Sequence, residues 1–312
     1  MTMNCPDSAP HAVARLRAAR LERSAKPFLA RGGSRRVHCT GCRLAVSHCS
    51  CALRIRLATR AGVCLLMHDS EPLKPSNTGW LIADVVADTF AFGWARTSVD
   101  PALLALLQDP QWRPCVVFPT EGVAPARVLG EAAFAPGCDW AAPHPAGDCG
   151  AGAGAGAQAP AARPLFILLD GTWAEARKMF HRSPYLERFP VLGLQGGEAT
   201  RYRLRHASQD DQWCTSEVAA RCLQLAGDAR AGALLQAWLA VYAERYDQAR
   251  QQRPAQPDSR AHQRLAALRT GGDARPQLPV ADAGAVRAVA AASYRASAAA
   301  PMPDRVALPA GV

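Results

Sequence analysis

The chain has 312 residues, of which 49% are hydrophobic, 6% aromatic and 20% charged, and its formal net charge at pH 7 is +10. This length fits about two domains, or one large domain with extensions, and the composition fits a globular body. No apolar run approaches the roughly 18 to 20 residues that a membrane-spanning helix needs, which excludes an integral membrane protein with such helices.

The net charge lies entirely in the first fifth of the chain. The first sixty residues contain 12 Lys and Arg but only two acids, Asp7 and Glu22, and the rest of the chain is balanced. A basic segment on a neutral body predicts a nucleic-acid partner, because phosphates favour clustered arginines; a solvated extension or an organelle transit peptide would show the same asymmetry. We expect residues 1–37 to form a disordered basic arm. The start contains Pro6 but no apolar run, so no secretory signal is predicted and we expect a cytoplasmic location.

A dense cysteine array follows this arm. Its spacing is C-x2-C-x6-C-x-C, formed by Cys39, Cys42, Cys49 and Cys51. Thiolates favour tetrahedral Zn²⁺, so residues 38–60 are predicted to form a zinc knuckle, in which His38 or His48 could replace one sulfur. Unpaired structural or redox cysteines are the alternative.

Strand and helix patterns alternate after the knuckle. Buried strands are predicted at residues 62–67, 91–95, 115–118 and 164–169. Helices are predicted at residues 77–86 with Ser76 as N-cap, and at 102–107, 174–180, 216–226 and 230–250. This alternation indicates an α/β fold with a mainly parallel sheet and flanking helices.

Two segments are expected to stay outside this fold. Residues 137–163 are rich in Gly, Ala and Pro, and residues 251–312 are rich in Ala, Pro, Arg and Gln. Neither can bury enough apolar surface to offset the ordering entropy, so we predict a disordered insertion and a disordered tail around an α/β domain of residues 61–250.

Polar residues gather where predicted strands lead into helices. The first such junction carries His68, Glu71, Lys74, Ser76, Asn77 and Thr78. In open α/β sheets ligands bind at the carboxyl ends of strands, and Lys74 with the backbone amides of residues 76–78 could hold a carboxylate or a phosphate. An ordinary helix cap in a solvated loop is the alternative.

The second junction is the sequence Asp170-Gly-Thr172-Trp173. Thr172 and Glu175 fit a capping box, which explains both residues structurally. Asp170 has no evident structural partner in the sequence, so it is predicted to accept a hydrogen bond from a ligand or to act as a base, and Asp170→Ala is expected to leave the fold intact. Trp173 could stack on a base or belong to the core. A third junction, with Glu217 in the first turn of a helix, fits either a cap or a ligand site.

These motifs together resemble the DTW-domain family, named for the D-x-T-W motif. The resemblance covers about residues 38–250 and includes the cysteine array, the run 74–79, the run 169–180, and the runs Ser183-Pro-Tyr-Leu, Tyr202-Arg-Leu-Arg and Cys214-Thr-Ser-Glu. It implies a relative of the knotted SPOUT methyltransferases with zinc on the cysteine array. It also implies a tRNA-uridine aminocarboxypropyltransferase, which moves the 3-amino-3-carboxypropyl group of S-adenosylmethionine to N3 of a uridine and releases methylthioadenosine.

The resemblance suggests roles for the junction residues. Asp170, Thr172 and Trp173 are the candidate catalytic residues, with Asp170 removing or orienting the N3 proton. The α-carboxylate of the donor is assigned to Lys74, Ser76, Asn77 and Thr78, and its α-ammonium to Glu71 or Glu217; His68 completes the candidate donor site.

Two other readings stay open at this point. A SPOUT-type RNA methyltransferase would use the same co-substrate and the same tRNA partner, and a non-catalytic zinc-knuckle protein would explain the cysteines and the basic arm. Binding of tRNA is predicted to rest on that arm and on Arg201, Arg203 and Arg205, which would share one face of a strand. The oligomeric state is left open.

Overall fold

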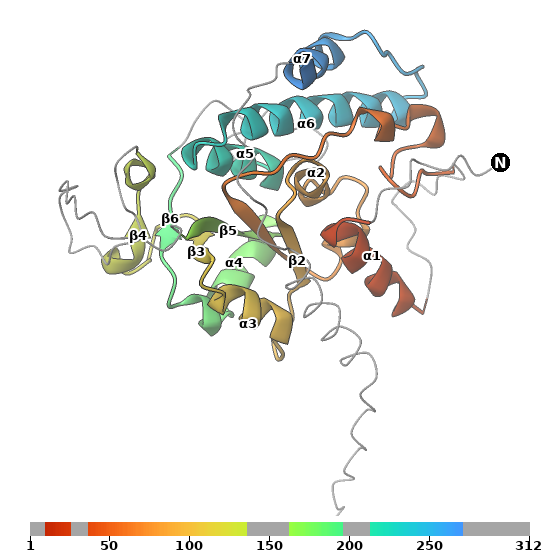
Figure 1. The fold of residues 1–312 in the computed structure, drawn as a ribbon. Helices are drawn as coiled ribbons and strands as arrows, with labels where there is room; N and C mark the ends of the chain where they lie inside the picture. The colour runs from red at the N-terminus through yellow and green to blue at the C-terminus, as the bar shows by residue number, and fades with distance from the viewer. Residues whose placement is uncertain (1–9, 26–36, 136–161, 196–212, 271–312) are drawn as a thin grey trace, which may run out of the picture.

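A six-stranded parallel sheet is the centre of the protein, as a computed structural model shows (Figure 1). The structure describes residues 10–25, 37–135, 162–195 and 213–270. In sheet order β2-β1-β5-β3-β6-β4, the strands are Thr89–Gly93, Gly62–Met67, Arg163–Asp170, Trp112–Val117, Val191–Leu192 and Val128–Leu129. Every pairing is parallel, so all strands end at the same edge of the sheet.

Strand β1, in the middle of the sheet, is apolar throughout because both faces of the sheet are covered. On β1, Val63 and Leu65 belong to the core on one face, whereas Cys64 and Leu66 belong to the core on the other. All six residues of β1 are buried. This is the pattern expected of a strand buried on both sides.

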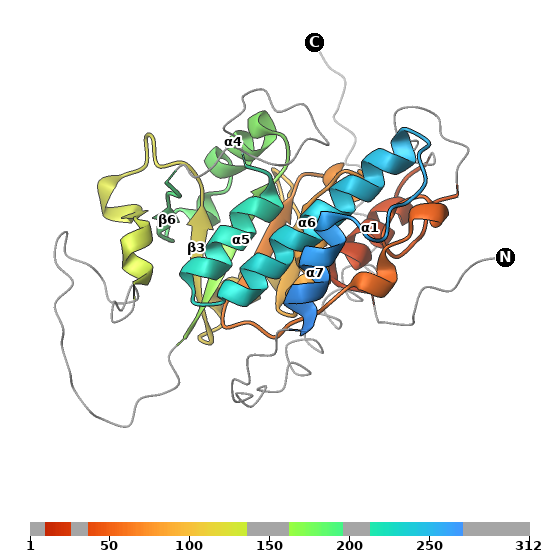
Figure 2. The same cartoon turned by 90° about the horizontal axis from the view of Figure 1, so that it is seen from above.

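Helices form a layer on each face. The described helices are α1 Ala12–Glu22, α2 Gly79–Val85, α3 Pro101–Gln108, α4 Trp173–His181, α5 Thr215–Leu225, α6 Ala229–Arg250 and α7 Arg260–Thr270. Helices α2, α5 and α6 cover one face, and α3 and α4 cover the other (Figure 1). Figure 2 shows α5, α6 and α7 side by side, with α7 against α6 rather than against the sheet.

The predicted parallel α/β fold is confirmed, and so are its main elements. The strand predicted at residues 62–67 has those bounds, and the other long strands and helices differ from prediction by a few residues at their ends. The two-residue strands β4 and β6 were not predicted, because a pair of residues carries no periodicity. Ser76 does not cap α2: the backbone N–H of Trp80 donates instead to Oδ1 of Asn77, at 3.1 Å.

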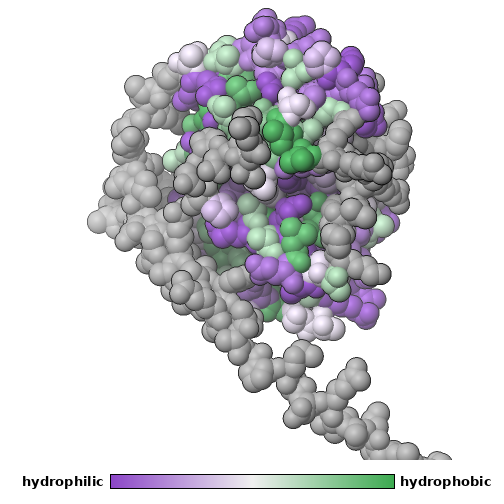
Figure 3. All heavy atoms as spheres, turned by 90° about the vertical axis from the view of Figure 1, so that its right-hand side faces the viewer, coloured by the Kyte–Doolittle hydropathy of each residue, from purple (hydrophilic) through white to green (hydrophobic). Residues whose placement is uncertain are grey.

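The expectation of disorder is wrong for part of the N-terminal arm. Residues 12–22 form α1, which contacts the edge strand β2 and the start of the polar loop after β1. Val13 is fully buried, and Arg20 donates through two nitrogens to the carboxylate of Asp69, at 2.7 and 2.8 Å. The alternation of Ala and Arg concealed this helix because its apolar face is narrow. On the side where α1 lies, hydrophilic and hydrophobic residues are interspersed (Figure 3).

The expected tail also contains a helix. Residues 260–270 form α7, and its buried side chains, His262 and Leu265, face α6 and the cysteine segment. An Ala-rich sequence can form such a helix when a neighbouring helix offers an apolar face. The structure therefore corrects the predicted tail boundary at residue 251.

Some expectations lie outside the described residues. These are most of the 137–163 insertion, the tail beyond residue 270, and the strand with Arg201, Arg203 and Arg205. The relationship to knotted methyltransferases stays a prediction. Among the helices that are described, none is long and apolar enough to cross a membrane.

The first prediction concerns His11, the N-cap of α1. Its Nδ1 accepts from the backbone N–H of Ala14 at 3.1 Å, and its Nε2 lies 3.4 Å from Oδ1 of the buried Asp84. Burial lowers the pKa of His11 below its usual value and outweighs the attraction of Asp84, so the folded protein binds this proton more weakly than the unfolded chain does. The stability that His11 supports is therefore present above about pH 6.5 and lost as the pH falls below it.

Urea unfolding at about pH 7.5 and about pH 5.5 measures this effect. The control is His11→Asn, because Asn is a good N-cap that does not titrate. We expect the free energy of unfolding to fall more on acidification in the wild type than in His11→Asn. Parallel losses in both proteins would contradict the role of His11.

Candidate active site at the carboxyl edge of the sheet

The polar junctions predicted from the sequence meet at the edge where the strands end. Asp170 is the last residue of β5 and pairs in register with Met67, the last residue of β1. The next residue on that side, His68, donates its backbone N–H to the Asp170 carbonyl at 2.9 Å. The first turns of α4 and α5 and the loop before α2 surround this point.

Asp170 is buried and fully engaged. The residue is 2% exposed. Its Oδ2 accepts a hydrogen bond from Nδ2 of Asn77, and its Oδ1 accepts one from the hydroxyl of Thr215, each at 2.7 Å. The expectation that Asp170 has no structural partner is therefore wrong. Its partners are 93 and 45 residues away in the chain, so no local pattern could reveal them. Asp170→Ala would leave these donors without their acceptor, at about 1–3 kcal/mol for each orphaned group.

Asn77 connects Asp170 to a second buried carboxylate. The same amide nitrogen lies 3.2 Å from Oε2 of Glu71, which is fully buried and also pairs with Lys74. The amide oxygen of Asn77 caps α2. Glu71 and Asn77, predicted as donor-binding residues, thus hold the interior of the site together.

Gly79 allows α2 to approach Asp170 closely. A Cβ atom at this position would lie 2.6 Å from Oδ2 of Asp170. Contacts this short do not occur between a Cβ and a carboxylate oxygen, so a larger residue would push the two apart. This explains why α2 begins with glycine.

The start of α5 closes the buried network. Thr78, also predicted as a donor-binding residue, is buried, and its hydroxyl accepts from the backbone N–H of Ser216 at 3.4 Å. Glu217 accepts from the backbone N–H of Cys214 at 2.9 Å, as in a capping box. Glu217 therefore caps the start of α5, as the sequence allowed. The residue is half-buried.

An acid–base pair faces solvent beside this network. Nδ1 of His68 lies 3.1 Å from Oε1 of Glu175, and each side chain is about a quarter exposed, at 27% and 26%. The other oxygen of Glu175 accepts from the backbone N–H of Thr172 at 2.7 Å, which completes the predicted capping box. Burial alone would raise the pKa of Glu175, but the hydrogen bonds from Thr172 and the nearby His68 and Lys74 lower it overall.

Sequence reasoning missed this pair because the capping box already explained Glu175. A carboxylate has two oxygens, and here one caps the helix while the other meets the imidazole. The ring of His68 also lies roughly parallel to the ring of Trp94, with an interplanar angle of 26° and centroids 6.3 Å apart. The imidazole of His68 thus lies between the carboxylate of Glu175 and the ring of Trp94.

The remaining predicted residues lie toward the surface. Lys74 and Ser76 are half-buried, Thr172 is exposed, and Trp173 is 41% exposed. Trp173 is therefore not a core residue. Beneath α1, a hollow next to His68 and Asp69 is lined by Leu16, Arg20 and Arg23, and has room for no more than about one water.

The four cysteines form a candidate metal site. Their sulfur atoms lie within 4.8 Å of one another, with Sγ–Sγ distances of 3.6 Å for Cys39–Cys51 and Cys39–Cys49 and 3.8 Å for Cys42–Cys49. Four sulfurs at about 2.3 Å from a tetrahedral Zn²⁺ would be about 3.8 Å apart. Hydrogen bonding from the Cys51 thiol lowers the pKa of Cys42, whereas burial raises the pKa of Cys49.

Neither flanking histidine belongs to this site. Nε2 of His48 is 2.9 Å from the carbonyl of Arg253, and His38 is exposed beside the cluster. The option of a histidine replacing a sulfur is not seen.

Arg43 joins the cysteine site to the polar loop. This residue follows Cys42, has a φ of +67° and is buried. Its guanidinium donates to the carbonyls of Lys74 and Asn77 at 2.8 and 3.1 Å, and lies 4.2 Å from the centroid of the Trp80 ring. The backbone on both sides of Ser76 is thus held from the cysteine segment.

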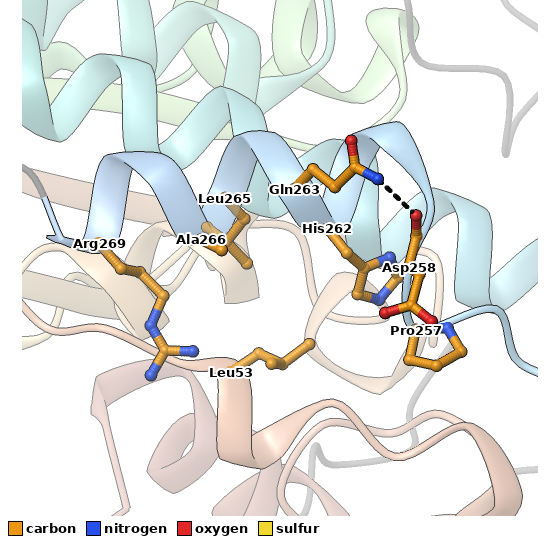
Figure 4. Close-up of a pocket in the computed structure, with 8 residues that line it drawn as sticks. All are labelled: Leu53, Pro257, Asp258, His262, Gln263, Leu265, Ala266 and Arg269. Carbon is orange, nitrogen blue, oxygen red and sulfur yellow. Dashed lines mark hydrogen bonds between the residues drawn. The ribbon is translucent and has the colours of Figure 1, made fainter.

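A second cavity shares no lining residue with this edge. It has a volume of about 200 Å³, is bounded by Leu53 and by residues of α7 and the turn before it, and includes the ring of His262 (Figure 4). That ring is already engaged, because Arg245 donates to its Nε2 at 2.9 Å and the Ser259 hydroxyl lies 2.8 Å from its Nδ1. The strand edge with Asp170 is therefore the better candidate for chemistry.

The family model described as DTW domain matches residues 36–247, more than half of the chain, and this stretch contains the cysteine site and all three junctions. Helices α1 and α7 lie outside the match. No solved structure matches the chain.

The second prediction is that the cysteine cluster binds one zinc ion per chain. Elemental analysis of purified protein should find zinc in stoichiometric amount. Cys39→Ser and Cys51→Ser should lose the metal and lower the melting temperature, because so small a segment has little core of its own. Cys222→Ala, a change at a buried cysteine outside the cluster, should keep it. Protein that contains neither zinc nor iron would refute the assignment.

The third prediction tests the close approach of Gly79 to Asp170. Alanine is favoured over glycine in a helix by about 1 kcal/mol, but overpacking typically costs about 1–3 kcal/mol. We therefore expect Gly79→Ala to lower the free energy of unfolding in a denaturant titration. Gly130→Ala is the control, since a Cβ there meets nothing within 4 Å. A stabilised Gly79→Ala protein would show that the approach is not tight.

Proposed function

We propose, since the chain belongs to the DTW-domain family, that it is a tRNA-uridine aminocarboxypropyltransferase. The family is consistent with tRNA modification. The observation that carries the proposal is the combination of a solvent-facing His68–Glu175 pair and an exposed Trp173 at the strand edge that Asp170 organises. The His68–Glu175 pair supplies a proton acceptor, and Trp173 supplies a flat surface on which a nucleobase can stack. Modification of a nucleobase requires both.

The proposed reaction breaks one bond and forms another. The bond between the sulfonium and Cγ of the aminocarboxypropyl group breaks, and Cγ forms a bond to N3 of the uridine. The N3 proton passes to a base, and the sulfur leaves as a neutral thioether in methylthioadenosine. Because the sulfonium is already a good leaving group, the protein mainly has to orient the two reactants and accept the proton.

We assign the proton acceptor to His68 rather than to Asp170. Glu175 lies at Nδ1 of His68, which leaves Nε2 as the nitrogen not engaged with that carboxylate. A carboxylate that orients an imidazole in this way is a common feature of general bases. Asp170 has both oxygens engaged and is buried, so it acts as a positioning residue for Asn77 and Thr215.

Solvent-facing residues are also the better candidates for holding the donor. Lys74 and Ser76 are half-buried and are assigned to its α-carboxylate. Of the two acids considered for the α-ammonium, Glu217 is half-buried whereas Glu71 has no exposed surface, so we assign Glu217. The cysteine cluster would hold a structural zinc, which keeps Arg43 in place.

Incubation with unmodified tRNA and S-adenosylmethionine, followed by digestion and mass spectrometry of the nucleosides, tests the reaction. The proposal predicts a uridine that carries one aminocarboxypropyl group. A methylated nucleoside would identify a methyltransferase instead. Bound but unmodified tRNA would identify a non-catalytic binder.

The fourth prediction concerns the base. His68→Asn should lower kcat by about 10²- to 10⁴-fold, the usual effect of removing a general base, while the melting temperature stays close to that of the wild type because the side chain is partly exposed. Glu175→Gln should retain the helix cap but lose the charge that orients His68, and should also reduce kcat. Near-normal turnover in folded His68→Asn protein would exclude the base role.

A further inference from the structure

The exposed face of α4 carries an aromatic surface next to the candidate site. Trp173 is stacked on Phe118, with ring centroids 5.6 Å apart and an interplanar angle of 12°. Phe118 is stacked in turn on Phe180, at 4.3 Å and 10°. The three rings form a column whose outermost member, Trp173, is 41% exposed. An indole supported from below in this way is ready to contact another flat ring without further ordering.

Cationic side chains continue this surface along the helix. Arg177 lies four residues after Trp173, and Lys178 and Arg182 are likewise four residues apart, so they form adjacent rows on one side of α4. All of these side chains are exposed, whereas Ala176 and Met179 are buried on the opposite side. The guanidinium of Arg177 lies 5.8 Å from the centroid of the Trp173 ring.

These cations are not neutralised by their described neighbours. Within the part of the chain that the structure describes, Arg177, Lys178 and Arg182 form no ion pair. Glu175, the acid on the same helix, is occupied by His68 and by the cap. The surface therefore presents positive charge that a polyanion would neutralise.

We propose that the exposed face of α4 is the docking surface for a single-stranded RNA segment, with one base stacked on Trp173 and phosphates bound by Arg177, Lys178 and Arg182. Stacked aromatic residues next to a row of cations are the combination that binds unpaired nucleotides. A protein partner would need acidic side chains opposite these cations, whereas every RNA segment carries phosphates. The proposal rests on the proposed function, because it identifies how the RNA substrate reaches the candidate site.

The position of this surface fits the candidate site. Trp173 follows Asp170 by three residues, and the cap at Thr172 joins the first turn of α4 to Glu175 and so to His68. A nucleotide next to the one stacked on Trp173 would therefore lie at the strand edge. Unpaired loops, rather than duplex, offer bases that can be placed in this way.

Binding assays without S-adenosylmethionine test the surface separately from the reaction. The probes are an unmodified tRNA transcript and a short fluorescent single-stranded RNA, measured by fluorescence anisotropy at several salt concentrations. The variants are Trp173→Ala, Trp173→Phe, and the triple variant Arg177→Gln, Lys178→Gln, Arg182→Gln. The matched control carries the same charge change on α7, at the exposed Arg260, Arg264 and Arg269.

We expect Trp173→Ala to weaken binding of the single-stranded probe by about 5- to 150-fold and Trp173→Phe to retain most of the affinity. The triple variant on α4 should reduce the slope of log affinity against log salt by about 2, since each lost phosphate contact removes about 0.7 on a single strand. The control on α7 should keep the wild-type slope. Melting temperatures of the two charge variants should be unchanged, because the altered Arg and Lys side chains are exposed.

Two failures can be told apart. The α4 surface is refuted if the wild type binds RNA and the α4 variants bind it with the same affinity and salt slope, or if the α7 control loses as much affinity as they do. The proposed function would then stand, and a protein partner would become the better explanation of this face. If the wild type binds neither probe, the proposed function itself fails together with the surface.

Discussion

The side-chain amide of Asn77 donates toward two buried carboxylates at once, and the arrangement of the strand edge depends on it. One of its contacts is to Asp170, at 2.7 Å, and the other is to Glu71, at 3.2 Å. Two carboxylates this close to one donor would repel each other in a buried setting unless further donors and cations balanced them. The Thr215 hydroxyl and the Lys74 ammonium provide that balance. The buried network thus fixes how the strands, α2 and α5 meet.

This arrangement is supported from segments on either side of the candidate site. Arg43 holds the loop carbonyls from the cysteine site, and Arg20 on α1 holds Asp69 at the other end of the loop. Asp84 on α2 is contacted by Arg54 and by the indole N–H of Trp238 on α6. The loop that carries the proposed donor-binding residues therefore has little freedom, which is what orientation of two reactants requires.

The sequence was sufficient to predict the sheet and the edge at which the polar junctions meet. Strands buried on both faces appear as continuous apolar runs, and β1 and β5 could be located within a residue or two for that reason. Helix α1 could not, because its stability comes from packing against β2 and from the Arg20–Asp69 contact rather than from a wide apolar stripe. The partners of Asp170 were equally hidden, since hydrogen bonds across the fold leave no trace in local spacing. The motif located residues that meet at one edge of the sheet, but not which of them would be buried and which would face solvent.

We propose that the bond between the sulfonium and Cγ of S-adenosylmethionine breaks at this strand edge as Cγ is transferred to the RNA. The most direct measurement is chromatographic identification of the co-product after the holo protein is mixed with labelled S-adenosylmethionine, with and without unmodified tRNA. The account predicts methylthioadenosine, formed only when tRNA is present and in a ratio of one to each modified uridine. Formation of S-adenosylhomocysteine, or of methylthioadenosine at the same rate without RNA, would contradict it.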